Sequence, residues 1–308
     1  MLFLFLIEGC RWEDAQKALP IFREGYLLTY HHCIPSERDC FDPILHQIGM
    51  AHSIDGNTWR VLEDFPKLSG SVPDIFVRDN HFWIYALPES YLLDTATLEI
   101  QKKLGVSVFD SNNNRIIQVD PSPIIDEEGR IVLFFLEGIP GIDPARCPQN
   151  KPCSKQFLSA TERKGSQGFV FDLDEGVRLN LPISGHEFAS DPDIFVGRDG
   201  LFYMYISRGQ GTQVFISKQL RGEYKEQGWL TQQNGGVACG HFDNLSNMFW
   251  SYTSKNVPQP WIQEIRYETH DDFDDLQFSK SLFSQDMLGN SKHHVMMHGS
   301  PGFFQNHP

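Results

Sequence analysis

The stretch SDPDIFVGRDGLFYMYIS, residues Ser190–Ser207, contains an apolar run, a polar turn and an aromatic-rich run. A closely similar stretch, SVPDIFVRDNHFWIYAL, occupies Ser71–Leu87. Two apolar runs joined by a short polar turn are typical of a β-hairpin. A hairpin that recurs at a distance is typical of repeat architectures, in which each unit packs against the next. The two stretches therefore predict a fold built from repeated hairpins.

The same pattern occurs three more times along the chain. The further copies are ALPIFREGYLLTYHH at 18–32, VDPSPIIDEEGRIVLFF at 119–135 and CGHFDNLSNMFWSYTSK at 239–255. The anchor residues of the five copies are Pro20, Pro73, Pro121, Pro192 and Gly240. Successive anchors are 53, 48, 71 and 48 residues apart, and three of these spacings are close to the length of a four-stranded propeller blade. The gap of 71 residues contains the Cys147–Cys153 segment, which we interpret as an insertion.

A second hairpin-like unit follows most of these copies, and patterns typical of long helices are scarce. We therefore predict an all-β protein, a five-bladed β-propeller that forms one domain. The expected blades cover about 12–65, 66–115, 116–182, 183–233 and 234–285, followed by a C-terminal tail at 286–308. This tail is rich in histidine, and we interpret it as a flexible or closing segment rather than a metal site.

Composition narrows the classes of partner. The chain has 308 residues, 40% of them hydrophobic, and a net charge of −14. It has no basic stripe, so neither nucleic acid nor an anionic membrane is an expected partner. The start, MLFLFLIEGC, lacks the basic region and the cleavage site of a signal peptide. This favours a cytoplasmic location and leaves secretion open if the natural chain begins further upstream.

The six cysteines include two pairs that are close in sequence. Cys33 with Cys40, and Cys147 with Cys153, lie in loop-like stretches where disulfides could form in an oxidising compartment. Free thiols are the equal alternative. A zinc site is a third interpretation, but the spacing matches no compact zinc pattern.

Residues just before the innermost strand of each blade converge on the central channel of a propeller. Carboxylates that gather there can serve as acid and base, because protonating a leaving oxygen and activating water are opposite tasks. The acidic residues at these positions are Asp14, Asp74, Asp120, Glu187, Asp191 and Asp193. The alternative for Asp191 and Asp193 is a turn-capping role, which suits aspartate beside proline.

Several of these motifs resemble the five-bladed propeller glycoside hydrolases, the superfamily with the family 43 arabinofuranosidases and xylosidases and the family 32 fructan hydrolases. DPSPIIDEEGRIVLFF resembles the third-blade strand and turn, VPDIFVRDNHFWIY the second-blade A-P-D strand, and SIDGNTW the S-x-D-G-x-x-W outer turn. CGHF resembles the fifth-blade G-H, whose histidine lies near an axial calcium or water cluster. The resemblance covers residues 18–276, and the fructan-hydrolase signatures are absent.

The resemblance implies three acidic roles, and the sequence departs from two of them. Asp120 stands where the family has its orienting and tuning aspartate. The glutamate that acts as proton donor is replaced in the E-x-P motif by serine, and Glu187 is the nearest glutamate. The first-blade base is replaced by Leu19, so Asp14 is the nearest upstream candidate and Asp191 is the expected base if the first blade lacks one.

Further residues near these strand starts are candidates for binding the substrate or an ion. Asp74, Asp193, His186 and Trp12 are candidate substrate-binding residues. His241 is the candidate residue near calcium, and its alternative is a packed core histidine. For the other tryptophans, packing within blades is the simpler interpretation.

We expect a glycoside hydrolase that acts on an oligo- or polysaccharide through carboxylates in the central funnel. The alternative is a carbohydrate-binding propeller without catalysis, which the displaced acid and base favour. A sugar phosphorylase would need Arg and Lys at the funnel, whereas Arg78 and Arg198 are expected in turns at the far ends of strands.

Overall fold

The computed structural model describes residues 25–33, 42–140, 143–148, 151–209, 211–231, 235–256, 263–271, 273, 276–282 and 297–306. Their strands form five sheets. Most strands alternate or cluster buried apolar side chains, as expected of sheets covered on both faces by neighbouring sheets. The protein is therefore all-β in the described ranges apart from short 3₁₀ turns such as η1 (Pro43–Leu45) and η3 (Arg198–Gly200).

The strand order in each sheet follows the chain for most of its length. The first sheet has the order β24 (Met297–Asn306), β1 (Gly25–Cys33), β2 (Gln47–Ser53) and β3 (Arg60–Val61), with β4 (Leu68–Ser69) paired to β2. The second has β5 (Ser71–Arg78), β6 (His81–Leu87), β7 (Ser90–Asp94) and β8 (Ile100–Leu104). The third has β11 (Gln118–Ile125), β12 (Ile131–Glu137), β13 (Cys153–Glu162), β14 (Val170–Leu173), β9 (Ser107–Phe109) and β10 (Arg115–Ile116), with β15 (Leu179–Ile183) paired to β13.

The last two sheets are regular four-stranded units. One contains β16 (Ser190–Val196), β17 (Phe202–Ser207), β18 (Thr212–Ser217) and β19 (Lys225–Thr231). The other contains β20 (Gly235–Asp243), β21 (Met248–Asn256), β22 (Gln263–His270) and β23 (Leu276–Ser281). Both have the up-and-down order expected of propeller blades.

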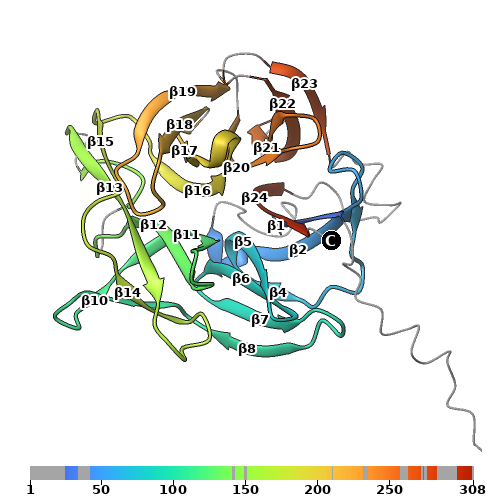
Figure 1. The fold of residues 1–308 in the computed structure, drawn as a ribbon, viewed down its shortest axis with the longest axis horizontal. Helices are drawn as coiled ribbons and strands as arrows, with labels where there is room; N and C mark the ends of the chain where they lie inside the picture. Colours follow the sequence, from blue (N-terminus) through green and yellow to red (C-terminus); the bar gives the residue numbers. More distant parts are fainter. Residues whose placement is uncertain are drawn as a thin grey trace, which may run out of the picture.

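The sheets surround a central axis, as Figure 1 shows. Their innermost strands contact one another in the closed order β24, β5, β11, β16, β20 and back to β24. This arrangement confirms the predicted all-β propeller. The count of five blades stays a prediction, because residues 1–24, 34–41 and 283–296, which flank the sheet of β1 and β24, lie outside the described ranges.

Four of the expected inner hairpins are confirmed by β5–β6, β11–β12, β16–β17 and β20–β21. The first expected hairpin, at 18–32, is replaced by a different pairing. β1 pairs with β2 on one side and with the C-terminal strand β24 on the other. Part of the expected tail at 286–308 is therefore an innermost strand, and Pro20 lies outside the described residues. The blade boundaries themselves stay predictions.

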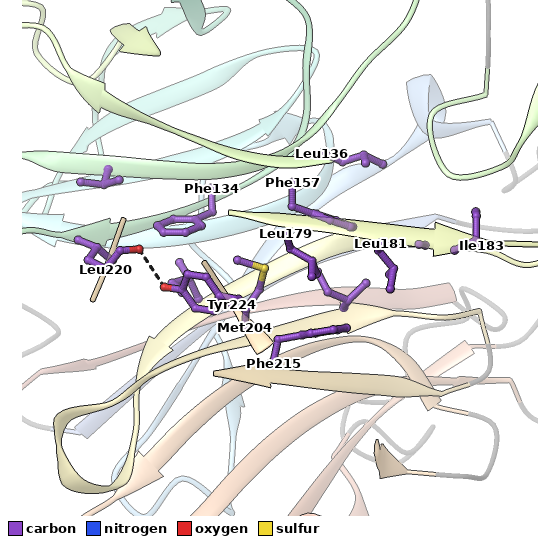
Figure 2. Close-up of a cluster of buried hydrophobic side chains, with 14 of the residues drawn as sticks. Phe134, Leu136, Phe157, Leu179, Leu181, Ile183, Met204, Phe215, Leu220 and Tyr224 are labelled. Atoms are coloured by element: carbon purple, nitrogen blue, oxygen red, sulfur yellow. Dashed lines mark hydrogen bonds between the residues drawn. The ribbon is translucent and has the colours of Figure 1, made fainter. Parts of the chain in front are cut away.

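Hydrophobic side chains fill the space between neighbouring sheets. Figure 2 shows the cluster between the third and fourth sheets, where Phe134 and Phe157 face Met204 and Phe215. The side chain of Tyr224 closes this cluster and donates a hydrogen bond to the carbonyl of Leu220 at 3.0 Å. Burial of large apolar side chains contributes roughly 1.5–3 kcal/mol for each one. Packing between sheets, rather than within one sheet, therefore stabilises the ring.

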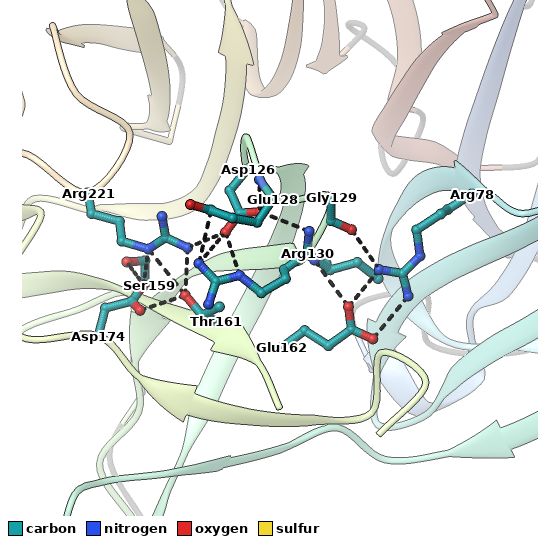
Figure 3. Close-up of polar contacts among 11 residues, drawn as sticks. Arg78, Asp126, Glu128, Gly129, Arg130, Ser159, Thr161, Glu162, Asp174 and Arg221 are labelled. Carbon is teal, nitrogen blue, oxygen red and sulfur yellow. Dashed lines mark hydrogen bonds and ion pairs between the residues drawn. The ribbon is translucent and has the colours of Figure 1, made fainter. Parts of the chain in front are cut away.

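Charged side chains connect the second, third and fourth sheets (Figure 3). These contacts lie near the ends of the inner strands β5 and β11, away from where those strands begin. Arg78 of β5 donates to both carboxylate oxygens of Glu162, at 2.6 and 3.0 Å. From the other neighbouring sheet, Arg221 donates to Asp126 at 2.8 Å and to Thr161. The third sheet is thus connected by arginine to the sheets on both of its sides.

Cysteine pairing is settled for one of the two close pairs. Cys147 and Cys153 form a disulfide. Cys33 is also disulfide-bonded, and Cys40, its expected partner, lies outside the described residues. Cys239 is a free and buried thiol. The first disulfide closes the loop between β12 and β13, which is the insertion that the long anchor spacing indicated.

Candidate active site

Each innermost strand carries the same irregularity near its start. The antiparallel register shifts between Ser71 and Asp74 in β5, and the shift recurs in β11, β16 and β20. In β24 the corresponding shift lies between Gly299 and Gly302. In β5, β11, β16 and β20 the first extra residue adopts a positive φ of 47° to 54°; these residues are Val72, Asp120, Asp191 and Val237. Such left-handed non-glycine residues are uncommon and often cluster at functional sites.

This shared bulge defines two layers of residues around the axis. The first axial layer consists of the first bulge residue of each strand: Val72, Asp120, Asp191, Val237 and, by register, Ser300. The second axial layer consists of the residue two positions later: Asp74, Ser122, Asp193, Cys239 and Gly302. Two aspartates therefore stand in each layer.

The four aspartates line one small cavity on the axis. Asp74, Asp120, Asp191 and Asp193 border a space of about 20 Å³, together with Val72, three prolines, Val237 and Ala238. No lysine or arginine of the described residues lines it. The structure therefore brings together four of the candidate site residues, in a space that holds about one water molecule.

Asp120 and Asp191 face each other from neighbouring strands of the first axial layer. The backbone N–H of Asp191 donates to Oδ2 of Asp120 at 3.3 Å. The Ser190 hydroxyl donates to Oδ2 of Asp191. Burial raises the pKa of Asp120 well above its usual value, and the negative charge of Asp191 raises it further. Burial raises the pKa of Asp191 to about 6, with the Ser190 hydrogen bond acting in the opposite direction.

The second axial layer contains a further pair of aspartates. Oδ2 of Asp74 accepts a hydrogen bond from the Ser122 hydroxyl at 2.8 Å, and Oδ2 of Asp193 accepts from the N–H of Gly240 at 2.8 Å. Burial raises the pKa of Asp74 to about 7. Burial and then the charge of Asp74 raise the pKa of Asp193 well above its usual value. Like charges in a desolvated space disfavour full ionisation, so this layer retains protons near neutral pH.

Glu187 and His186 lie apart from the axial cavity on an exposed turn. Oε2 of Glu187 accepts from the Ser184 N–H at 2.6 Å and lies 3.4 Å from Nη2 of Arg208. The hydrogen bond from Ser184 is the main cause that lowers the pKa of Glu187. A proton donor needs a raised pKa, so this environment is opposite to the role expected for Glu187. Asp14 and Trp12 lie outside the described residues.

His241 does not line the cavity, because the register of β20 differs from the expected one. The bulge lies at Val237 and Ala238, two residues before the anchor Gly240. His241 therefore occupies the position that Phe76 and Phe195 hold in their strands. Its ring lies 5.6 Å from that of Trp250 and 6.1 Å from that of Tyr26.

No group of three or more His, Cys, Asp or Glu side chains within the described ranges has an arrangement that could hold a metal ion. Calcium near His241 stays a prediction. None of the helices in those ranges has the length and apolar character that crossing a membrane requires. Arg78 and Arg198, considered above for phosphate, hydrogen-bond to Glu162 and to the carbonyl of Asn247, away from the axis.

Sequence reasoning missed Ser122, although a signal for it was present. Aligning V-P-D, D-P-S and D-P-D of β5, β11 and β16 places Ser122 beside Asp74 and Asp193 in the repeat. The structure shows that Ser122 is buried and hydrogen-bonded to Asp74.

No family model matches the sequence, and no curated protein matches it. Solved structures do match. An endo-arabinase from Bacteroides thetaiotaomicron is 13% identical, with a TM-score of 0.52, over 88% of this chain and 96% of that one. An α-L-arabinofuranosidase from Clostridium thermocellum is 15% identical, with a TM-score of 0.48, over 71% of this chain and 74% of that one. A xylan β-1,4-xylosidase from Bacillus halodurans is 14% identical, with a TM-score of 0.46, over 78% of this chain and 49% of that one. At this level of identity the likeness concerns the fold alone, and the chain shares the fold of the endo-arabinase.

Proposed function

We propose that this protein hydrolyses glycosidic bonds at the mouth of the axial cavity, with Asp120 and Asp191 as the reacting carboxyl groups. The observation that carries the proposal is the pair itself: two aspartates at the same register in neighbouring strands, joined by the hydrogen bond from the Asp191 N–H to Asp120. Burial raises both pKa values, and the charge of Asp191 raises that of Asp120 further. Two carboxyl groups whose environments separate their pKa values can divide the acid and base roles.

The separation assigns the roles. Asp191, with a pKa of about 6, is mostly ionised at neutral pH and serves as the base. Asp120, with a pKa well above its usual value, keeps its proton and serves as the donor. Asp120 protonates the leaving oxygen as the glycosidic bond breaks, while Asp191 accepts a proton from the attacking water. This assignment moves the donor role from Glu187, the expected donor, to Asp120.

The size of the cavity favours a second candidate function. A space of about 20 Å³ accepts a water molecule and is far too small for a sugar ring. Hydrolysis therefore requires the sugar to bind above the first axial layer, with only the reacting atoms reaching the aspartates. A propeller that binds a saccharide at the same mouth without cleaving it does not need the sugar to contact these aspartates.

A panel of nitrophenyl arabinosides, xylosides, galactosides and fucosides tests the proposal. Linear arabinan is added to the panel because one of the similar structures, with a TM-score of 0.52, is an endo-arabinase. Asp191→Asn and Asp120→Asn should each lower kcat by roughly a hundredfold to ten-thousandfold. Asp120→Asn should lose less on substrates with good leaving groups, because these need little protonation. Glu187→Gln is the matched control and should stay within about threefold of the parent.

The outcomes separate the two candidates. Equal losses in Glu187→Gln and Asp120→Asn would return the donor role to Glu187. Binding of an oligosaccharide without turnover of any substrate would establish the binding function instead. Turnover that survives both aspartate substitutions would exclude the axial pair as the site.

A further inference from the structure

Hydrogen bonds of the second axial layer connect each inner strand to its neighbour around the axis. Oγ of Ser122 in β11 accepts from the N–H of Ile194 in β16 at 3.2 Å. Oδ2 of Asp193 in β16 accepts from the N–H of Gly240 in β20 at 2.8 Å. Ile194 and Gly240 hold the same register in their strands, one residue after the second-layer position. One rule therefore describes both contacts: a second-layer side chain accepts the backbone N–H of the next strand.

The contact between β5 and β11 departs from this rule for a covalent reason. The residue of β11 at the donor register is Pro123, which has no N–H. Oδ2 of Asp74 accepts instead from the Ser122 hydroxyl at 2.8 Å. Ser122 thus donates to the preceding strand and accepts from the following one. Its hydroxyl replaces the donor that proline removes.

The contact between β24 and β5 departs from the rule in a second way. The second-layer residue of β24 is Gly302, which has no side chain to accept the N–H of Ile75. Oδ1 of Asp74 accepts that N–H instead, at 2.7 Å. A Cβ at Gly302 would lie 2.5 Å from Cα of Asp74, so no larger residue fits there without movement. Both oxygens of Asp74 are consequently committed, one to its own strand and one to Ser122.

We propose that Ser122 is a positioning residue for the axial aspartates. Its single hydroxyl proton is committed to Asp74, and its oxygen is held by Ile194 of β16, the strand that carries Asp191 and Asp193. Replacing it with alanine frees one oxygen of Asp74 and leaves the N–H of Ile194 without its acceptor, and an unpaired buried donor destabilises the contact between β11 and β16. The relative placement of β11 and β16, and with it the Asp120–Asp191 pair, depends on this hydroxyl.

The ionisation of Asp74 reports on this contact independently of any activity. The groups around Asp74 are Ser122 from β11, Asp193 from β16, Cys239 from β20 and Gly302 from β24, with Asp120 and Asp191 along the same cavity. The hydrogen bond from Ser122 lowers the pKa of Asp74 against the larger effect of burial. Removal of that bond should therefore move the titration of Asp74 further upward from about 7.

The test compares Ser122→Ala and Ser122→Thr with a matched control, Ser159→Ala. Ser159 is also a buried serine that donates to an aspartate, Asp174, at 2.6 Å, but it lies away from the axis. The carboxyl of Asp74 is followed by ¹³C NMR in aspartate-labelled protein and assigned with Asp74→Asn. Ser122→Ala should raise the Asp74 midpoint by about one pH unit, the effect of one hydrogen bond to a carboxylate. Ser122→Thr should restore it, and Ser159→Ala should leave it unchanged.

The kinetic arm rests on the proposed function. Ser122→Ala should lower kcat by about tenfold with KM within about twofold, because misplacement affects the reacting geometry more than binding. An unchanged Asp74 midpoint in Ser122→Ala, or an equal shift in Ser159→Ala, would overturn the positioning role. A shifted Asp74 midpoint with normal kcat would mean that Ser122 affects Asp74 but not the Asp120–Asp191 pair, and it would also overturn the positioning role. If the parent cleaves no glycoside, the proposed function fails and the NMR titration alone decides whether Ser122 orders Asp74.

Discussion

At the scale of single residues, a displacement of two positions separates two kinds of axial aspartate. Asp191 and Asp193 belong to one strand, yet the first stands in the layer proposed to react and the second accepts a backbone N–H from β20. Both line the axial cavity, and the bulge, with its positive φ at Asp191, lies between the register positions of Ser190 and Asp193. The role of each aspartate therefore depends on its register position in the strand, since the two residues are chemically the same.

The raised pKa of Asp74 predicts how stability depends on pH. The folded state holds this proton to about pH 7, whereas the unfolded chain releases it near 3.8. Stability from this group is therefore fully present below pH 4 and is lost as the pH rises through 7. Asp74→Asn, which cannot ionise, should flatten the fall in melting temperature between pH 5 and pH 8. Thermal melts across that range measure it.

The control is Asp79→Asn, since the side chain of Asp79 is 83% exposed. Its melting curve should run parallel to that of the parent. Parallel curves for Asp74→Asn as well would show that Asp74 does not hold a proton in the folded protein.

At the scale of elements, paired charges hold adjacent sheets in register. The carboxylate of Glu162 in β13 accepts both Arg78 bonds and the N–H of Ile131, and only 9% of its side chain is exposed. The Arg163–Asp172 pair lies in the same sheet, but its side chains are 43% and 56% exposed. The two pairs share one chemistry and differ in burial and in whether they join two sheets.

This contrast predicts different costs of removal. Glu162→Gln should lower the free energy of unfolding by roughly 2 kcal/mol, less than for a fully buried pair because Arg78 is partly exposed. Asp172→Asn should cost less than about 1 kcal/mol, as is usual for exposed pairs. Denaturant titrations of both variants measure the difference. Equal losses would mean that the Arg78–Glu162 contact adds nothing as a link between sheets.

At the scale of the whole molecule, the two ends of the chain meet in one sheet. β24 pairs with β1 along most of its length and places Gly302 against Asp74 of the next sheet. The ring is closed by non-local pairing, which brings a high entropic cost but joins the first and last strands. Close approach of backbones at Gly302 is part of that closure.

Gly302→Ala tests the closure. The added methyl would lie within 2.7 Å of both the carbonyl oxygen of Pro73 and Oδ1 of Asp74, so the strand must shift. We expect a loss of about 1–3 kcal/mol in the free energy of unfolding, the usual cost of overpacking. Gly105→Ala is the control, because its new Cβ would make only an ordinary contact of 3.4 Å. Similar melting temperatures for the two variants would contradict a tight junction at Gly302.

Much of the fold was predictable because hairpins are local. Apolar runs flanking the polar turns RDN, EEG, RDG and NLS predicted four inner hairpins, and the repeat placed Asp120 and Asp191 at strand starts. In the fifth copy the sequence pattern favours Gly240 as the anchor, two residues too late, because Ala238 stands where the other copies have proline. That offset alone put His241 on the axis and removed Cys239 from it.

The sequence by itself therefore determined the all-β repeat and the acidic character of the axis. Only the tertiary structure decided which strand closes the ring, because pairing of β24 with β1 joins residues more than 250 positions apart and has no local pattern. The tertiary structure also decided the division of the carboxyl groups. Burial raises the pKa values of Asp120 and Asp191, and the charge of Asp191 raises that of Asp120 further, whereas a hydrogen bond from Ser184 lowers the pKa of the exposed Glu187. These effects depend on neighbours that the order of residues does not show.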